Sequence, residues 1–517
     1  MAETCSFQLE ETTIAEINMA FDARALTSQQ LTQLYLNRIH AYNNHGPRLN
    51  AINTINLNAL ETSAALDLER QSTGKRSLLH GIPVFVKDNY DTFDLPTTAG
   101  SVLLKDSIPP DDAFLVKQLR EPGAVILGKT AMSEWAWIGA KSLIGITVNP
   151  YKLNRAPTGS SSGRGVAIAA NFAVVATGSD TGGSIRNPSA VNALVGIKPT
   201  LGLTSRDGII PLAPAFDVGG PITRTVTDAA ITLGIMTGID VNHRQTYKSE
   251  AQFYKDYTQF LDQNALRSAR IGVVEDFFGS NKEIDDSIRT AIAILKELGA
   301  IVIEPIHYPE KVLAVRTEVH NRVIYTEFKS KIADYLITLE DKYPKTFAEI
   351  FALSKSHNGT DSQNQDLLEL FESVALAGSL SDPAYLDAID NGIPLIRNAI
   401  REIMDSYNLD ALVYPTRRCP PYPLPFVVDP SYVCEDGLPA SNFANITGFP
   451  EINVPTGWTE DGIPISISFF GRACNEPILL GFAYAYEQAT KYRRPHNTTP
   501  PLPGEVIEYT RVATSGE

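Results

Sequence analysis

The chain has 517 residues, with 59 acidic and 44 basic side chains, a formal net charge of −15 at pH 7 and 43% hydrophobic residues. This apolar content is enough for a large buried core and excludes a disordered or collagen-like chain. The acidic balance disfavours binding to nucleic acid or to an acidic membrane surface, because both need a basic face. The four cysteines form neither a disulfide-rich scaffold nor a paired metal motif, which is typical of a reducing compartment.

The N-terminus carries no export signal of the usual charged-then-apolar kind. The most apolar stretch begins at Val166 and is too short to span a bilayer. We therefore expect a cytoplasmic protein with no membrane partner.

The first 75 residues have the apolar spacing of helices. Apolar residues recur from Leu31 to Tyr42 at the spacing of one helix face, behind a candidate N-cap at Ser28. Residues 1–75 are therefore predicted to be a helical lead-in that packs on a larger body, residues 76–517.

From Leu79 onward, strand-like and helix-like segments alternate, which is typical of an α/β fold with a sheet covered by helices. Residues 165–178 combine a helix-like half with a strand-like half. Further helices are predicted over 112–120 and 286–299, and strands over 82–86, 124–127, 270–274, 300–306, 411–415 and 464–470.

Two later regions have a different pattern. Residues 311–408 are predicted to be mostly helical, broken by a polar stretch at 355–366, and could form a cap over the sheet. The Pro-rich tail after Arg494 is expected to run over the surface without regular structure.

One segment matches the phosphate-loop pattern letter for letter. GAVILGKT, residues 123–130, fits G-x-x-x-x-G-K-[ST] and would indicate a nucleotide-binding NTPase. A phosphate loop needs its strand before the first glycine and turning backbone between the glycines. Here the residues between Gly123 and Gly128 are themselves strand-like, so the context favours a strand that ends in a turn.

A second segment matches the nucleophile elbow of α/β-hydrolases. GSSSG, residues 159–163, fits G-x-S-x-G with Ser161 as the nucleophile. An elbow follows a strand and requires an acid and then a histidine later in the chain. The preceding segment has two prolines and reads as loop, and the last histidine, His496, lies in the Pro-rich tail, so the flanks disfavour this alternative.

The third candidate combines two Gly/Ser loops, residues 157–165 and 177–188, with a lysine, Lys87, at the end of a predicted strand. Each feature alone is typical of a turn or of a solvated side chain. Together, GIPVFVKDN, GSSSGRG and GSDTGGSIRNPSA, followed by VGIKPTLGLTSRDGIIPL and GGPITRTVTDAA, resemble the amidase signature family. The resemblance runs from about Leu79 to Ala230, with weaker echoes at 413–416, 445–455 and 467–471.

The resemblance implies a Ser-Ser-Lys triad, with Ser184 as the nucleophile, Ser160 as the bridging serine and Lys87 as the base. The residue chemistry agrees, because a serine hydroxyl needs an adjacent base and no motif places a histidine. A lysine accepts a proton only when neutral, and burial behind the apolar strand would lower its pKa. A second hydroxyl can relay the proton between the lysine and the nucleophile.

The bridging position has three neighbouring candidates. The resemblance implies a cis peptide bond entering the bridging serine, here between Gly159 and Ser160. Ser161 and Ser162 are the rivals, and the register of the motif selects Ser160 and leaves Ser161 in a supporting place.

The loop before the nucleophile can gather backbone amides in one small concavity, because two of its residues are glycines free to take unusual dihedrals. Such donors contribute roughly 2.7–4 kcal/mol each to an acyl-transfer transition state. The predicted oxyanion hole consists of Thr181, Gly182, Gly183 and Ser184. Asp180 and Arg186 flank the nucleophile and are expected to form an ion pair that holds the loop.

The resemblance also implies the fold and the reaction. The expected fold is one α/β domain with a mixed twisted β-sheet core covered by α-helices. The expected reaction is hydrolysis of a carboxylic or peptide C-terminal amide through a seryl acyl-enzyme, with no metal and no organic cofactor. We expect a small-molecule or short-peptide amide as the substrate and allow for a homodimer.

The alternative function comes from a similarity to the A-type subunit of glutamyl-tRNA amidotransferase, which releases ammonia from glutamine inside a complex. The serine loop resembles the stand-alone enzymes more closely, and the acidic balance offers no evident tRNA-facing surface.

This chain departs from the family pattern at the serine loop. Where many members carry GGSSGGSA, it has Thr158, Ser162 and Arg164 in place of two glycines and a small residue. Arg164 either recognises a carboxylate or caps the helix that begins there. The serine run is similar to that of peptide amidases, which favours peptide amides as the substrates.

Overall fold

The computed structural model describes residues 2–137, 141–356, 365–430, 432, 434 and 440–512. The strands of its large sheet are, in chain order, β2 (Ile52–Ile55), β3 (Pro83–Lys87), β4 (Val125–Thr130), β7 (Val175–Asp180), β8 (Val195–Lys198), β9 (Val218–Thr223), β10 (Arg270–Val274), β11 (Ile301–Ile306), β12 (Ala411–Pro415), β13 (Glu451–Trp458) and β14 (Pro464–Phe470). Two short strands, β5 (Lys141–Ser142) and β6 (Gly145–Ile146), form a separate hairpin.

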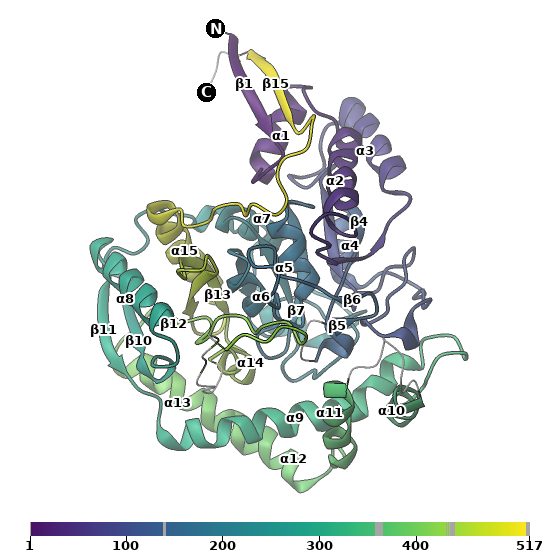
Figure 1. Ribbon diagram of the computed structural model, residues 1–517. Helices are drawn as coiled ribbons and strands as arrows, with labels where there is room; N and C mark the ends of the chain where they lie inside the picture. The colour runs from purple at the N-terminus through teal and green to yellow at the C-terminus, as the bar shows by residue number, and fades with distance from the viewer. Residues whose placement is uncertain are drawn as a thin grey trace.

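Among the described residues, the large sheet has 11 strands in the order β11-β10-β12-β14-β13-β8-β9-β7-β3-β4-β2. Strand β3 is parallel to both β4 and β7, whereas β7 is antiparallel to β9. Because the two directions are mixed and helices cover the sheet, the predicted α/β class is confirmed (Figure 1).

The helices lie between these strands and in one long helical insertion. In chain order they are α1 (Ile14–Asp22), α2 (Ser28–Tyr42), α3 (Ala59–Thr73), α4 (Phe114–Arg120), α5 (Ser162–Ala169), α6 (Arg186–Ala190), α7 (Val226–Met236), α8 (Lys282–Glu297), α9 (Glu310–Leu336), α10 (Phe347–Ser356), α11 (Gln365–Leu376), α12 (Pro383–Asp387), α13 (Ile393–Ser406), α14 (Asn442–Thr447) and α15 (Glu476–Thr490).

Local signals explain several of these elements. Every residue of β3 is buried, as expected for an apolar run between two parallel neighbours. Helix α8 starts earlier than predicted because the Asn281 side chain accepts a hydrogen bond from the Ile284 amide at 3.1 Å. Helix α2 begins at Ser28, but its N-cap is Thr27, whose side chain accepts from the Gln30 amide.

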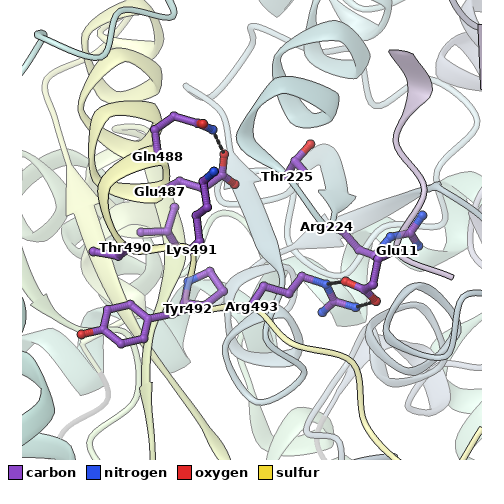
Figure 2. Close-up of a pocket in the computed structure, with 11 residues that line it drawn as sticks. Glu11, Arg224, Thr225, Glu487, Gln488, Thr490, Lys491, Tyr492 and Arg493 are labelled. Carbon is purple, nitrogen blue, oxygen red and sulfur yellow. Dashed lines mark hydrogen bonds and ion pairs between the residues drawn. The ribbon is translucent and has the colours of Figure 1, made fainter. Parts of the chain in front are cut away.

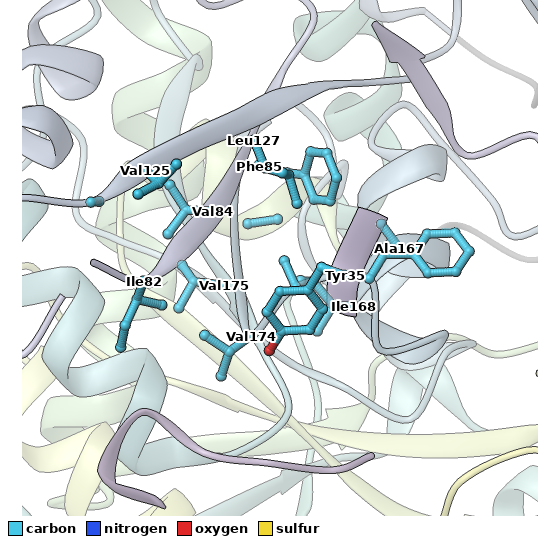
Figure 3. Close-up of a cluster of buried hydrophobic side chains, with 14 of the residues drawn as sticks. Tyr35, Ile82, Val84, Phe85, Val125, Leu127, Ala167, Ile168, Val174 and Val175 are labelled. Carbon is cyan, nitrogen blue, oxygen red and sulfur yellow. The ribbon is translucent and has the colours of Figure 1, made fainter. Parts of the chain in front are cut away.

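One hydrophobic core fixes the strands and helix that will carry the candidate site. It joins side chains of α2, β3, β4, α5 and the start of β7 (Figure 3). Tyr35, Val84, Phe85, Val125 and Ile168 are completely buried in it. Each such side chain stabilises the fold by roughly 1.5–3 kcal/mol, so β3, α5 and β7 are held rigidly together.

The helical region predicted at 311–408 is present as helices α9 to α13, which lie together at one end of the molecule (Figure 1). They share a second core with the loop after β4, including Trp135, Phe328 and Phe371. The polar stretch predicted at 355–366 falls largely outside the described residues.

The chain ends differ from the prediction. Strand β1 (Ala2–Gln8) pairs antiparallel with β15 (Val506–Val512), apart from the large sheet (Figure 1). The Pro-rich tail is therefore not entirely irregular, and the N-terminal segment is not purely helical, since it also supplies β2 to the large sheet. Local patterns miss β1 and β15 because each strand is stabilised by a partner at the other end of the chain.

A disulfide joins Cys419 and Cys434, with Cα atoms 5.6 Å apart. The spacing of the cysteines in the sequence did not reveal this bond. Within the described ranges, no helix is long and apolar enough to cross a membrane.

Candidate functional site

Lys87 lies at the carboxyl end of β3 and has no exposed surface. Its Nζ lies 2.8 Å from Ser160 Oγ and 2.8 Å from Ser179 Oγ. Ser179 is on the neighbouring strand β7, and Asn89 Nδ2 donates to the same Ser179 hydroxyl at 3.1 Å. The parallel pairing of β3 and β7 brings these polar groups together, because the carboxyl ends of parallel strands meet at one edge.

The surroundings of Lys87 favour its uncharged form. Burial lowers the pKa of the lysine well below its ordinary value, and the positive charge of Arg164 lowers it further. The carboxylates of Asp180 and Asp217 act in the opposite direction but do not reverse the shift. A buried amine beside a hydroxyl is therefore available as a proton acceptor.

Ser160 and Ser161 precede helix α5 and take different roles. The peptide bond between Gly159 and Ser160 is cis, and Ser160 is the serine that faces Lys87. Ser161 is completely buried and donates a hydrogen bond to the Ser179 carbonyl at 3.3 Å. The hydrolase elbow is therefore wrong for this chain, because its nucleophile must stand exposed at a strand end.

Ser184 lies in the loop between β7 and α6 and is partly exposed. Within the described part of the chain, its hydroxyl makes no hydrogen bond to Ser160. Catalytic hydrogen bonds often close only when substrate binds, so this geometry leaves Ser184 a candidate nucleophile.

The backbone amides of the loop are divided between two tasks. Gly183 has a φ of 113°, where a side chain would be strained and would collide with Asn187. Its amide donates to Asp180 Oδ1 at 2.7 Å. The prediction that Gly183 supplies an oxyanion donor needs correction, because this N–H is already used. The amides of Thr181, Gly182 and Ser184 have no acceptor among the described residues.

The predicted ion pair between Asp180 and Arg186 is present, and both side chains are completely buried, 3.0 Å apart. Asp180 also accepts from the Ile185 amide at 3.0 Å, and Arg186 also pairs with Glu451. Asn445 donates to Asp180 at 2.9 Å and accepts from Arg186 at 2.7 Å. The carboxylates of Asp180 and Glu451 and the side-chain amide of Asn445 thus fix Arg186, which in turn fixes the Ser184 loop.

Sequence reasoning missed two contributors to the site. Ser179 belongs to a motif that was already matched, but its contact with Lys87 depends on strand pairing. His320 of α9 lies in a region without any motif, yet its Nε2 lies 3.4 Å from the Thr181 carbonyl. Burial lowers the pKa of His320 to about 4, so the ring is neutral and stacks on Phe216.

The phosphate-loop match is overturned by the position of its lysine. Lys129 is part of β4 and completely buried, and its Nζ donates to Thr97 Oγ1 at 2.8 Å and to Thr92 Oγ1 at 3.1 Å. Because this amine is buried and already hydrogen-bonded to neighbouring side chains, it cannot bind a phosphate. No cluster of three or more metal-ligating side chains occurs in the described ranges.

A pocket of about 250 Å³ lies away from this site (Figure 2). Thr225 and the end of α15 line it. Thr225 comes just after Thr223, the last residue of β9, and Thr223 pairs with Val175, the first residue of β7. The Ser184 loop follows the last residue of β7, so the pocket is at the opposite edge of the sheet. Its walls carry an ion pair between Glu11 and Arg493 at 2.6 Å.

Comparisons with known proteins agree with this geometry. The sequence model of the Amidase family matches residues 30–480. A probable amidase of Arabidopsis thaliana is 36% identical over 95% of this chain and 92% of that protein. The A-type subunit of glutamyl-tRNA(Gln) amidotransferase from Alkaliphilus metalliredigens is 34% identical over 93% of this chain and 97% of its own. The crystal structure of native peptide amidase from Stenotrophomonas maltophilia has a TM-score of 0.86 and 37% identity, covering 95% of this chain and 99% of that one.

Proposed function

Because the chain belongs to the amidase signature family, whose enzymes act on carbon–nitrogen bonds, we propose that it hydrolyses the terminal amide of short peptides or of small carboxylic amides. The proposed machinery is the triad of Lys87, Ser160 and Ser184. The products are the free carboxylic acid and ammonia.

The contact between Lys87 Nζ and Ser160 Oγ, at 2.8 Å inside the fold, carries this proposal. A neutral amine has two N–H donors and one lone pair. Ser179 offers two acceptors to those donors, its hydroxyl at 2.8 Å and its carbonyl at 3.3 Å. The lone pair is then left for the Ser160 hydroxyl, which is the arrangement that a base requires.

In the acylation step, Lys87 accepts the proton of Ser160 while Ser160 accepts the proton of Ser184. The Ser184 oxygen attacks the amide carbonyl carbon, and the carbonyl oxygen becomes an oxyanion. The amides of Thr181, Gly182 and Ser184 are the donors proposed to stabilise it. The carbon–nitrogen bond then breaks, and the leaving nitrogen takes a proton back through Ser160.

In the deacylation step, water attacks the ester formed on Ser184. The same two groups, Lys87 and Ser160, accept the proton from water and return it to the Ser184 oxygen when the ester bond breaks. The acid leaves and the triad is restored, so no external proton donor or cofactor enters the balance.

Peptide amides are favoured because the peptide amidase of Stenotrophomonas maltophilia matches nearly the whole chain with a TM-score of 0.86. A second candidate function is that of a glutamine-hydrolysing subunit of an amidotransferase. It is supported by the relative from Alkaliphilus metalliredigens, which is 34% identical over 93% of this chain.

Ammonia release by the purified full chain separates the two candidates. We expect turnover of C-terminally amidated di- and tripeptides and none of free glutamine. Turnover of glutamine alone would establish the second candidate and exclude the first.

The same assay tests the assigned triad. We expect Ser184→Ala to abolish turnover. Ser162→Ala is the matched control, because its buried hydroxyl has no hydrogen-bond partner in the described part of the chain. Full activity in folded Ser184→Ala would contradict the assigned nucleophile.

A further inference from the structure

Arg164, in the first turn of α5, is a buried cation without an anion. Its side chain is completely buried, and none of its three guanidinium nitrogens has a hydrogen-bond partner among the described residues. Two other buried arginines reach carboxylates: Arg38 reaches Glu505 at 2.7 Å, and Arg186 reaches Asp180 at 3.0 Å. An unpaired buried charge destabilises a fold, so Arg164 does not serve to stabilise the protein. Such charges occur mainly at functional sites, where they alter the ionisation of neighbouring groups.

The nearest opposite charge does not neutralise this guanidinium. Burial lowers the pKa of Arg164 itself to about 9, and the negative charge of Asp88 only partly offsets this shift. Asp88 accepts a hydrogen bond from Asn53 at 2.6 Å and lies 3.9 Å from the ammonium group of Lys129. Burial also raises the pKa of Asp88, which weakens its hold on a cation.

Within the candidate site, the charge of Arg164 acts on Lys87. Helix α5 packs against β3, the strand that ends in Lys87. The charged groups that act on Lys87 are Arg164 from α5, Asp180 from β7 and Asp217. Asp180 is engaged by Arg186, so the repulsion from Arg164 adds to the effect of burial in lowering the pKa of Lys87.

We infer that Arg164 is a positioning residue for the reaction: its positive charge, on the helix that packs against the Lys87 strand, disfavours a second positive charge and keeps the lysine as a free amine. The inference rests on the proposed function, in which Lys87 must accept the proton of Ser160. It assigns a role to a residue that departs from the glycine-rich family pattern. It also replaces the two sequence-based interpretations of Arg164, a helix cap and a carboxylate-binding residue.

The ionisation of Lys87 can be measured without any substrate. Protein labelled with ¹³C at the lysine ε-carbons is titrated by NMR, and the Lys87 signal is identified by its loss in Lys87→Met. In Arg164→Met we expect the pKa of Lys87 to rise by about one pH unit. Arg164→Lys keeps a positive charge and should leave that pKa close to the wild-type value.

The control removes a positive charge elsewhere. Arg397 of α13 donates to the Thr447 carbonyl at 2.8 Å and is not among the charges that act on Lys87. Arg397→Met should therefore leave the Lys87 titration unchanged. If Arg164→Met does not fold, Arg164→Leu is the second apolar replacement. An ordinary lysine pKa in the wild-type protein would overturn the inference without any variant.

The pH profile of kcat/KM gives the second readout. In Arg164→Met the acid limb should move to higher pH, so that activity on that limb falls about tenfold while the plateau is kept. A raised KM confined to substrates with a carboxylate, with no shift of the limb, would show anion recognition instead and overturn the inference. If the wild-type chain hydrolyses no amide but the NMR shift is present, the proposed function fails and the role of Arg164 stands.

Discussion

The two edges of the large sheet differ in the partners of certain buried basic side chains. At the pocket edge, Arg493 forms a two-pronged ion pair with Glu11, and Arg224 donates to backbone carbonyls (Figure 2). At the other edge, Lys87 and Arg164 are completely buried and touch no carboxylate within hydrogen-bond distance in the described part of the chain. The pocket of Figure 2 is therefore on the edge where Arg493 has a carboxylate partner, and the candidate triad is on the edge where Lys87 and Arg164 have none. Buried basic groups without a carboxylate partner, rather than the pocket, indicate where the chemistry takes place.

The largest expected effect is at the edge that holds the candidate triad. Ser184→Ala and Lys87→Met should each lower kcat/KM roughly 10⁴-fold or more, because triad members act as a unit. Lys87→Met should also raise the melting temperature, since it replaces a desolvated amine with an apolar side chain. Amide hydrolysis and differential scanning calorimetry measure the two effects. A lower melting temperature for Lys87→Met would contradict the claim that the desolvated amine destabilises the fold.

The next effect concerns the ion pair of Asp180 and Arg186, which holds the Ser184 loop. Asp180→Asn leaves Arg186 with one carboxylate instead of two and should destabilise the protein by about 3–5 kcal/mol. It should also lower kcat, because the Gly183 amide loses its charged acceptor. Urea unfolding gives the free energy and ammonia release gives kcat. Unchanged values for both would mean that Asp180 does not hold the loop.

The matched change at the pocket edge should leave catalysis alone. Glu11→Gln leaves Arg493 with only neutral acceptors and should destabilise the protein by about 1–3 kcal/mol. We expect kcat/KM to stay within twofold of the wild-type value, as measured below the unfolding transition. A tenfold loss in folded protein would show that the two edges are coupled, and the comparison would fail.

The smallest expected effect is the pH dependence that Glu487 confers. Burial raises the pKa of this carboxyl from 4.5 to about 7 in the folded chain. Between these values the folded chain binds more protons than the unfolded one, so stability falls as pH rises through this window and levels off above about 7. Glu487→Gln should reduce the difference in unfolding free energy between pH 5 and pH 8 by about 1 kcal/mol, because the side chain is only half-buried. An unchanged difference would contradict an elevated pKa for Glu487.

The sequence predicted those parts of the fold whose signal is local. Strand β3 and helix α8 were found from an apolar run and from helical spacing, although the Asn281 cap moved the start of α8. The pairing of β1 with β15 and the disulfide between Cys419 and Cys434 were not found. Neither has a local pattern, because each depends on where the rest of the chain places two distant segments.

The candidate site divides in the same way. Motif register placed Ser160 beside Lys87, in agreement with the 2.8 Å contact between them. It did not predict that the Gly183 amide is occupied by Asp180, or that His320 of the helical region reaches the Thr181 carbonyl. Those contacts depend on loop geometry and on a helix packed from a segment without any motif.

By itself, the sequence determined the residue types of the site, their order and the family to which the chain belongs, since these are written in contiguous motifs. Tertiary structure alone decided which of these groups are charged. Lys87 and Arg164 lie 77 positions apart, and only the packing of α5 on β3 removes water from both and lets one charge act on the other. Ionisation depends on desolvation and on neighbouring charge, and both are properties of the packed fold.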